Sequence, residues 1–238
     1  MPTNVPMDLP GTMAAPARRT PASDHAAIEA VRRGFPGAAV TGACMIAGPA
    51  LAVAASALGV DTYRARGKDF VAAMAAHPTT FGTAVQVSLA AMMLLLVAVI
   101  GLATMITATQ RSWGRAAGVV TVVGLLGPIS FESVYWSASK ITDSAAHRAA
   151  AAHLIDQSQI IPRSIMNISG PCLVAGFILL GVAAARSGVL DRTRAVLLGL
   201  TCLIPAGFIS GHLSIAVVAF ACTAMALMPL GVKILRSR

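Results

Sequence analysis

The chain has 238 residues, of which 56% are hydrophobic and 11% are charged, whereas soluble domains average about 45–50% and about 25%. So few charged residues cannot cover the surface of a water-soluble protein of this length, which excludes a soluble enzyme. The net charge of +9 comes from basic residues scattered between apolar runs, without the basic stripe that binds nucleic acid. The sequence therefore predicts an all-α polytopic helix bundle whose partner is the lipid bilayer, not nucleic acid.

The N-terminal segment, residues 1–36, differs from the rest because prolines interrupt it and it offers few apolar residues to bury. Residues 1–22 are expected to be disordered. Ser23 is a suitable N-cap for a short helix that ends at Arg32-Arg33-Gly34. We interpret the segment as a disordered tail with one short helix.

Six apolar segments follow, each close to the roughly 20 residues that cross a bilayer. The last two form one apolar stretch, residues 195–232, which as a single helix would be about twice the hydrocarbon thickness. Ser210-Gly211-His212 at its middle is therefore predicted to be a hairpin. Within a transmembrane domain of residues 37–235, the predicted spans are residues 37–60, 81–108, 116–137, 166–185, 195–211 and 213–232.

Two longer loops join these spans on one side of the membrane. In the first, we predict a helix over residues 63–76 whose Phe70, Val71 and Met74 rest on the bilayer surface. In the second, we predict a helix over residues 142–160 that Pro162 stops. Shorter links, residues 109–115 and 186–194, join the spans on the other side.

The distribution of Arg and Lys predicts the orientation. With six spans, the termini and the two short links share one side, which carries twelve of the 18 basic residues. Cytoplasmic segments are enriched in Lys and Arg, so both termini are predicted to be cytoplasmic. Trp113 and Trp136 bracket the third span as interfacial anchors. The Ala-rich, Arg-heavy composition is typical of a high-GC bacterium, which predicts a bacterial inner membrane.

Glu132 is the only acidic residue inside a predicted span. A carboxylate at this depth is costly, usually faces a bundle interior or a watery cavity, and counts as a functional hypothesis by default. The position predicts a group that exchanges protons. The alternative interpretation is structural: Glu132 reaches water at the interface, or bonds Ser130, Ser133 or a neighbouring helix.

Proline occurs in every predicted span except the second. Pro171 and Pro229 lie near span ends, which leaves Pro49, Pro128 and Pro205 as candidate helix kinks. Transporters use interrupted helices to expose backbone carbonyls to a substrate. Proline is also simply more frequent in membrane helices than in soluble ones, so ordinary packing is the alternative.

Histidine and aspartate residues on the predicted outer face are candidate metal ligands. Two pairs lie three or four residues apart, so each pair shares a helix face, and His/carboxylate sets bind transition metals. The spacing matches no specific motif, and solvated loop histidines are the alternative. No haem or dinucleotide motif occurs, so no cofactor is expected. The candidates are His77, Asp143, His147, His153, Asp156 and His212.

Two stretches support a resemblance at the level of layout: residues 77–82 (His-Pro-Thr-Thr-Phe-Gly), which enter the second span, and residues 187–192 (Ser-Gly-Val-Leu-Asp-Arg), which lead into the fifth. Over residues 40–235 the chain resembles a group of bacterial six-span membrane proteins catalogued as a domain of unknown function. The resemblance implies the six-span fold and no catalytic residues.

Three function classes stay open. The first is transport or permeation of a small solute or ion, using a cavity near Glu132 and the proline kinks. The second is a non-catalytic membrane subunit, sensor or assembly partner, in a homo-oligomer or with another membrane protein, bound through small-residue faces such as Gly114-x-x-x-Gly118. The third, which ranks last, is a metal-dependent membrane enzyme on the outer face.

Overall fold

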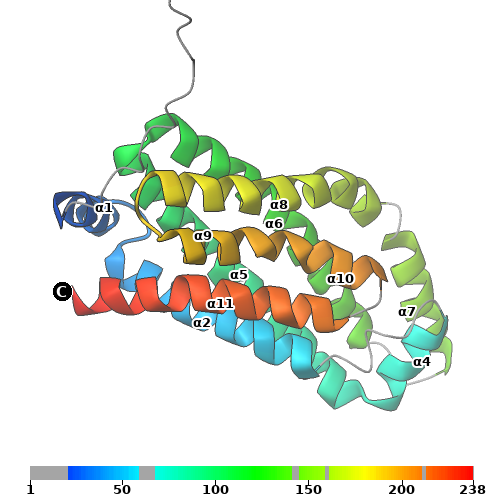
Figure 1. The fold of residues 1–238 in the computed structure, drawn as a ribbon. Helices are drawn as coiled ribbons and strands as arrows, with labels where there is room; N and C mark the ends of the chain where they lie inside the picture. Colours follow the sequence, from blue (N-terminus) through cyan, green and yellow to red (C-terminus); the bar gives the residue numbers. More distant parts are fainter. Residues whose placement is uncertain (1–20, 59–67, 141–144, 159–160, 211–212, 238) are drawn as a thin grey trace, which may run out of the picture.

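The computed structural model describes residues 21–58, 68–140, 145–158, 161–210 and 213–237. Within these ranges the chain is helical and has no strand (Figure 1). The elements are α1 (Pro21–Arg33), α2 (Ala38–Leu58), α4 (Lys68–Ala76), α5 (Pro78–Thr109), α6 (Arg111–Ser139), α7 (Ala145–Ser158), α8 (Ile161–Arg186), α9 (Arg192–Gly199), the 3₁₀ helix η1 (Leu200–Leu203), α10 (Ile204–Ser210) and α11 (Leu213–Arg236). Residues 1–20 of the predicted disordered segment 1–22 lie outside the described residues. The prediction of disorder is wrong for the last two residues of that segment, because α1 begins at Pro21, and Ser23 therefore lies inside the helix and is not its N-cap.

Five helices, α2, α5, α6, α8 and α11, are long and apolar enough to cross a membrane. They coincide with five of the six predicted spans. Helices α5 and α6 contain 32 and 29 residues, so each extends well past a hydrocarbon layer of about 30 Å. The predicted seven-residue link between them is wrong, because both helices continue until only Gln110 separates them.

The remaining predicted span, residues 195–211, is not one continuous α-helix. The segment consists of α9, η1 and α10 in succession. Pro205 explains the interruption, since proline has no N–H to donate to the Thr201 carbonyl and its ring would clash with that carbonyl. The Ile204 amide bonds the Thr201 carbonyl instead, which is the tighter 3₁₀ pattern.

The long helices form a closed ring. Each of α2, α5, α6 and α8 packs against the next, α8 packs against α9 and η1, and α11 packs against that interrupted segment and against α2. Glycines permit the close approaches: a Cβ atom at Gly124 of α6 would lie 2.5 Å from the backbone of Leu173 in α8. Small residues let membrane helices pack at such short range.

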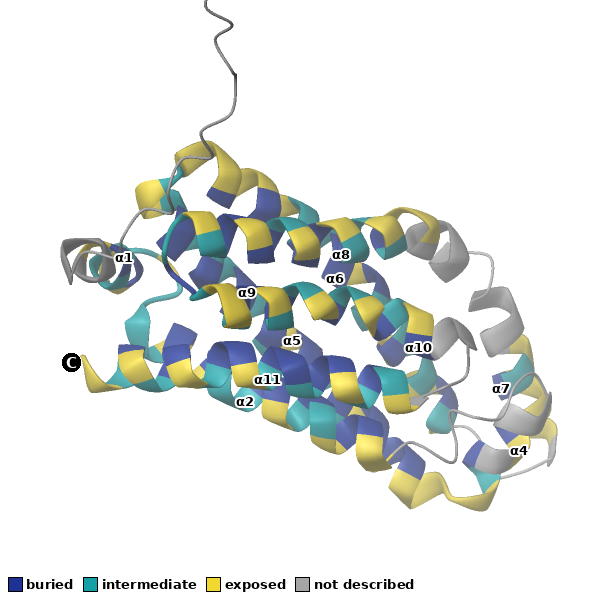
Figure 2. Cartoon of the chain, viewed as in Figure 1, coloured by how far each residue is buried: buried dark blue, intermediate teal, exposed yellow. Residues whose placement is uncertain are grey.

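The interior and the exterior of the ring are both apolar. Phe177, Phe220 and Leu95 are among the largest fully buried side chains of the core. On the outside, Ile168, Val119 and other large apolar side chains are mostly exposed (Figure 2). An apolar exterior around a packed bundle suits hydrocarbon as the surrounding medium and is rare in water-soluble monomers.

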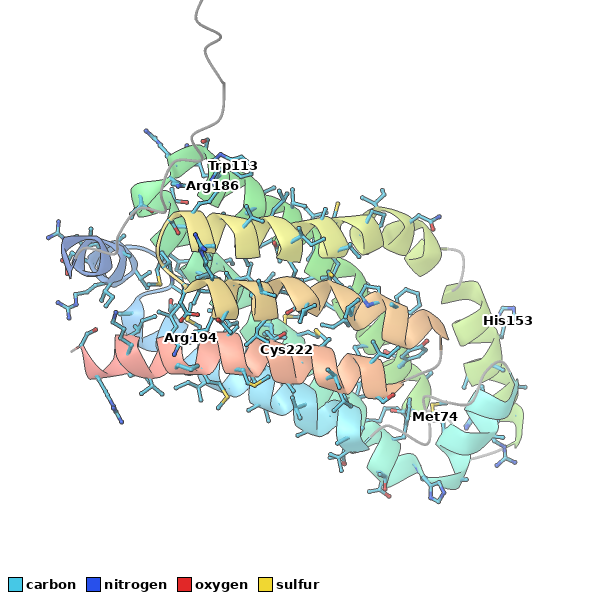
Figure 3. The ribbon with its side chains drawn as sticks, in the orientation of Figure 1. Met74, Trp113, His153, Arg186, Arg194 and Cys222 are labelled. Carbon is cyan, nitrogen blue, oxygen red and sulfur yellow. The ribbon has the colours of Figure 1, made fainter. Side chains whose placement is uncertain are left out.

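One end of the ring, which we call the capped end, is covered by α4 and α7 (Figure 1). A separate apolar cluster forms there from α4, α5, α6 and α7; its buried members are Val71, Met74, Phe81, Val85, Ala138 and Ala151. The prediction that Val71 and Met74 rest on the bilayer surface is therefore wrong. These side chains instead bury apolar area inside the protein, and Met74 is fully buried (Figure 3).

The predicted outer-loop helices are present in the described residues as α4 and α7. Helix α4 begins at Lys68, and residues 59–67 lie outside the described residues. Helix α7 ends at Ser158, and Pro162 belongs to the first turn of α8, a position that tolerates proline because the amides of the first turn have no partner within the helix. Pro162 therefore lies inside the next helix and does not terminate α7.

The opposite end, which we call the basic end, holds α1, the Gln110 turn and the end of α11 (Figure 1). Helix α1 is seen along its axis there, while the ring helices run across the view, so α1 lies across their ends. Its Ala27 and Val31 are buried against the bundle. The Arg32 guanidinium donates a hydrogen bond of 2.7 Å to the Ser237 carbonyl beyond α11. Both ends of the helical chain therefore meet at this end.

The two tryptophans lie at opposite ends of α6. Trp113 and Trp136 are 41% and 38% exposed, and each ring has a cation above it. The Arg186 guanidinium of α8 lies 5.4 Å from the Trp113 ring centroid (Figure 3), and the Lys140 ammonium lies 5.8 Å from that of Trp136. Half-exposed indoles paired with cations are typical of the two membrane interfaces.

Candidate functional site

Glu132 of α6 is buried at the contact between α5 and α6. The residue is only 7% exposed, and the hydroxyl of Ser88 in α5 donates a hydrogen bond of 2.7 Å to its Oε1. The predicted alternative partners, Ser130 and Ser133, donate instead to backbone carbonyls of their own helix, those of Leu126 and Ser130. Glu132 therefore faces the bundle and bonds a neighbouring helix.

Apolar layers lie on both sides of this pair along the bundle axis. Toward the capped end, Val85 lies one turn before Ser88, and Ala138 lies almost two turns after Glu132; both belong to the cluster under α4 and α7. Toward the basic end, Met92 and Leu125 belong to the main core. The carboxyl group is thus enclosed between two packed apolar regions. The phenol of Tyr135 is close enough to interact electrostatically with it.

Two of the three candidate kinks lie within helices that continue through them. Pro49 is inside α2 and Pro128 is inside α6. Pro128 lies one turn before Glu132 and cannot donate a hydrogen bond to the carbonyl of Gly124. Since Gly124 is the residue at which α6 meets the backbone of α8, Pro128 leaves one backbone acceptor without its usual donor at this contact.

A second buried polar contact joins the interrupted segment to α11. The Thr201 and Thr223 hydroxyl oxygens are 2.7 Å apart, and both side chains are fully buried. The Thr223 hydroxyl donates to the Ala219 carbonyl at 2.9 Å. A hydroxyl carries one hydrogen, so Thr201 is the donor toward Thr223. Thr201 thereby connects η1 to α11 at the turn where the helix is interrupted.

Sequence reasoning missed three residues of these two contacts. Ser88, Thr201 and Thr223 are uncharged and lie within apolar runs, so composition gives them no prominence. The interruption of the helix between α9 and α10 was indicated in the sequence by one residue, Pro205, which was predicted as a kink. A proline in the middle of a 17-residue predicted span, six residues after a glycine at position 199, indicates where the hydrogen-bond pattern must change.

The structure describes the side chains of three of the six metal candidates. His77, His147 and His153 are exposed, and His153 points away from the bundle (Figure 3). Asp143 and His212 lie outside the described residues, and only the backbone of Asp156 is described, within α7. Across the described part of the chain, no three His, Cys, Asp or Glu side chains are grouped to hold a metal ion. The outer-face metal site stays a prediction.

The chain was compared with protein-family models, with curated proteins and with solved structures. None of the three comparisons found a match. The resemblance to bacterial six-span proteins therefore stays a prediction, and the function has to be argued from the geometry of this chain.

Proposed function

We propose that this chain is a six-span protein of a bacterial inner membrane that moves protons, alone or with a small solute, through its helix ring. The meeting of the two chain ends supports six spans. Arg32 beyond the start of the ring bonds Ser237 beyond its end, so the chain between them crosses the bundle an even number of times. Five long helices would give an odd number. The segment α9–η1–α10 supplies the sixth crossing.

The charge distribution supports the orientation. At the basic end, the described residues include Arg111, Arg115, Arg186, Lys233 and Arg236, together with the arginines of α1 and α9. At the capped end the described residues have fewer cations: Lys68, Lys140, Arg148 and Arg163. The enrichment of Arg and Lys on the cytoplasmic side supports a cytoplasmic basic end. In this orientation α4 and α7 cover the outer mouth of the ring.

Glu132 is the observation that carries the proposed activity. A carboxyl group inside a membrane protein costs a few kcal/mol to place, and such groups mark ion pathways and proton relays. Here it is 7% exposed, accepts a hydrogen bond from Ser88, and is separated from both ends of the ring by packed side chains. This arrangement is what an occluded proton site requires: a titratable group closed to water on both sides.

Access to Glu132 then requires movement on one side at a time. The cluster under α4 and α7 is small and separate from the main core, so the cap can shift without disturbing the ring. In the wall between α8 and α11, η1 and Pro205 interrupt the segment α9–η1–α10, which is the one crossing in the described residues that is not a regular helix. Interrupted helices of this kind form the moving parts of many transporters. We assign α4 and α7 to a gate on the outer side. We assign movement of the interrupted segment α9–η1–α10 to the opening of Glu132 toward the cytoplasmic side.

Proton flux into proteoliposomes tests the proposal. The full chain is reconstituted with a pH-sensitive dye inside the vesicles, and a pH gradient is imposed. Glu132→Gln keeps the shape of the side chain but removes its proton exchange, so we expect flux to fall at least about tenfold, since a positioned proton-transfer group contributes that much or more. Glu29→Gln makes the same change on an exposed side chain of α1 and should leave flux unchanged.

Two outcomes would contradict the proposal. One is a wild-type flux no greater than that of empty vesicles under every imposed gradient and potential. The other is equal flux in the wild type and Glu132→Gln, which would assign Glu132 a structural role. Circular dichroism and elution from a sizing column in detergent establish that each variant is folded before its flux is compared.

A further inference from the structure

A groove of about 750 Å³ lies on the outside of the bundle at the basic end, between α1, α5 and α6. Its wall on α5 consists of residues spaced three and four apart, from Ile100 to Ala108, and its wall on α6 runs from Gly114 to Val123. Ala30 of α1 borders it. The volume is within the range of sites that hold small molecules, about 300–1,000 Å³.

Small side chains create the groove. A Cβ atom at Gly114 would lie 2.5 Å from the Thr107 hydroxyl, and one at Gly118 would lie 2.7 Å from the Ala103 methyl. Helices α5 and α6 therefore approach closely beside the Gln110 turn, and the short side chains that flank the contact leave a hollow. These two glycines already pack against α5 of the same chain, so the Gly114-x-x-x-Gly118 pattern is not available to pack against a second copy.

The lining is apolar along most of its length and carries a cation at one end. The threonine hydroxyls of this wall already donate hydrogen bonds within α5: Thr104 donates to the Ile100 carbonyl and Thr107 to the Ala103 carbonyl. Arg115 lines the groove near the Gln110 turn. From Arg115 to Val123 the wall descends eight residues, about 12 Å toward the middle of the bundle.

Arg115 has no acidic partner among the described residues. Arg111, four residues before it and therefore on the same side of α6, likewise forms no ion pair with a described residue. The nearby carboxylate of Glu29 is paired with Arg32 and Arg33 of its own helix. Within the described part of the chain, the head of the groove thus has positive charge without an acidic partner, and the half-exposed Trp113 lies two residues before Arg115 in α6.

We infer that this groove binds an anionic phospholipid, with the phosphate at Arg115 and Arg111 and one acyl chain along the apolar wall of α5 and α6. A guanidinium binds phosphate through paired hydrogen bonds, and basic pockets between membrane helices hold acidic lipid headgroups. Helix α1, which lies across the bundle ends beside the groove, would be fixed in place by the bound lipid. This inference does not depend on the transport activity proposed above.

Native mass spectrometry of the full chain in mild detergent tests the inference, with phosphatidylglycerol and phosphatidylcholine of equal chain length as probes. We expect the wild type to retain phosphatidylglycerol in preference to phosphatidylcholine. Arg115→Gln should weaken phosphatidylglycerol binding about fivefold, the effect of one basic residue at a charged membrane surface. Arg148→Gln removes the same charge from an exposed position of α7 at the other end and should have no effect.

A second pair of variants tests the groove itself and serves if Arg115→Gln does not fold. Ala108→Trp fills the groove, whereas Ala116→Trp places the same side chain on an exposed position of α6 that does not line it. Only Ala108→Trp should lose phosphatidylglycerol. Equal retention of the two lipids, equal behaviour of the two tryptophan variants, or a stable dimer that excludes lipid would each overturn the inference.

Discussion

Two polar contacts between helices in the described part of this apolar bundle have the same length but differ in charge. The Ser88 and Glu132 oxygens are 2.7 Å apart, and so are the Thr201 and Thr223 hydroxyl oxygens. Both contacts are buried. Only the first contains a group that can ionise, and only that group is expensive to hold in a membrane.

The difference separates a structural contact from a functional one. A neutral hydroxyl pair fixes how one helix meets another, and its average contribution in a membrane protein is about 0.6 kcal/mol. A buried carboxyl group gives little net gain, because its desolvation offsets much of what its partners return, but removing one partner is costly because the buried group loses its hydrogen bond. We therefore expect the threonine pair to matter for stability alone, whereas the contact between Ser88 and Glu132 should matter for stability and, through Glu132, for activity.

Removal of the Ser88 hydroxyl should produce the largest change in stability. Ser88→Ala deletes a hydrogen bond to the carboxyl group of Glu132, and hydrogen bonds to charged groups contribute about 1.5–3 kcal/mol. We expect the free energy of unfolding to fall by that amount in mixed detergent micelles titrated with dodecyl sulfate.

Ser130→Ala is the matched control for Ser88→Ala. It removes a hydroxyl that bonds only the Leu126 carbonyl of its own helix, and should change stability by less than about 0.5 kcal/mol. If Ser88→Ala were no more destabilising than Ser130→Ala, the contact between Ser88 and Glu132 would have no energetic role, and the contrast with the threonine pair would disappear.

The threonine pair should respond asymmetrically. Thr223→Val leaves the buried Thr201 hydroxyl without its acceptor and should cost about 1 kcal/mol. Thr201→Val leaves the Thr223 hydroxyl bonded to the Ala219 carbonyl, and should cost about half as much. The same unfolding titration measures both, with Thr83→Val at an exposed position of α5 as the control. Equal costs would contradict the assignment of Thr201 as the donor, and loss of proton flux in either variant would contradict a purely structural role.

The sequence was sufficient for the features that hydrophobicity and charge determine. Long apolar runs predicted α2, α5, α6, α8 and α11, because a helix is the way to satisfy backbone hydrogen bonds in hydrocarbon. Glu132 was identified because one acidic residue is conspicuous within such a run. The hydrogen bond from Ser88 of α5 is the bond to a neighbouring helix that the structural interpretation named, and the functional role of Glu132 stays a prediction.

The features that depend on packing could not be predicted in this way. Nothing in the composition indicates that Ser88, 44 residues before Glu132, lies beside it, since the register of α5 against α6 follows from the one-residue turn at Gln110. Val71 and Met74 were predicted on the bilayer surface because amphipathic spacing cannot tell a lipid surface from a protein surface. The cluster with Phe81 and Ala151 exists only once α4 and α7 fold over the ring.

The interruption of the proposed sixth crossing, α9–η1–α10, should yield the smallest effect on stability and the most local one. Pro205→Ala restores an amide that can bond the Thr201 carbonyl, so residues 200–206 can join α9 and α10 in one α-helix. Because the native 3₁₀ turn already satisfies that carbonyl through Ile204, the free energy of unfolding should change by less than about 1 kcal/mol. Amide hydrogen exchange over residues 200–206 should nevertheless slow, since the replacement removes the break at which the segment opens. Pro229→Ala, an exposed position within α11, is the control and should leave that exchange unchanged. If both variants gave the same exchange rates, the interruption would be a static feature of packing, and the movement that we assign to this crossing would have to lie elsewhere in the ring.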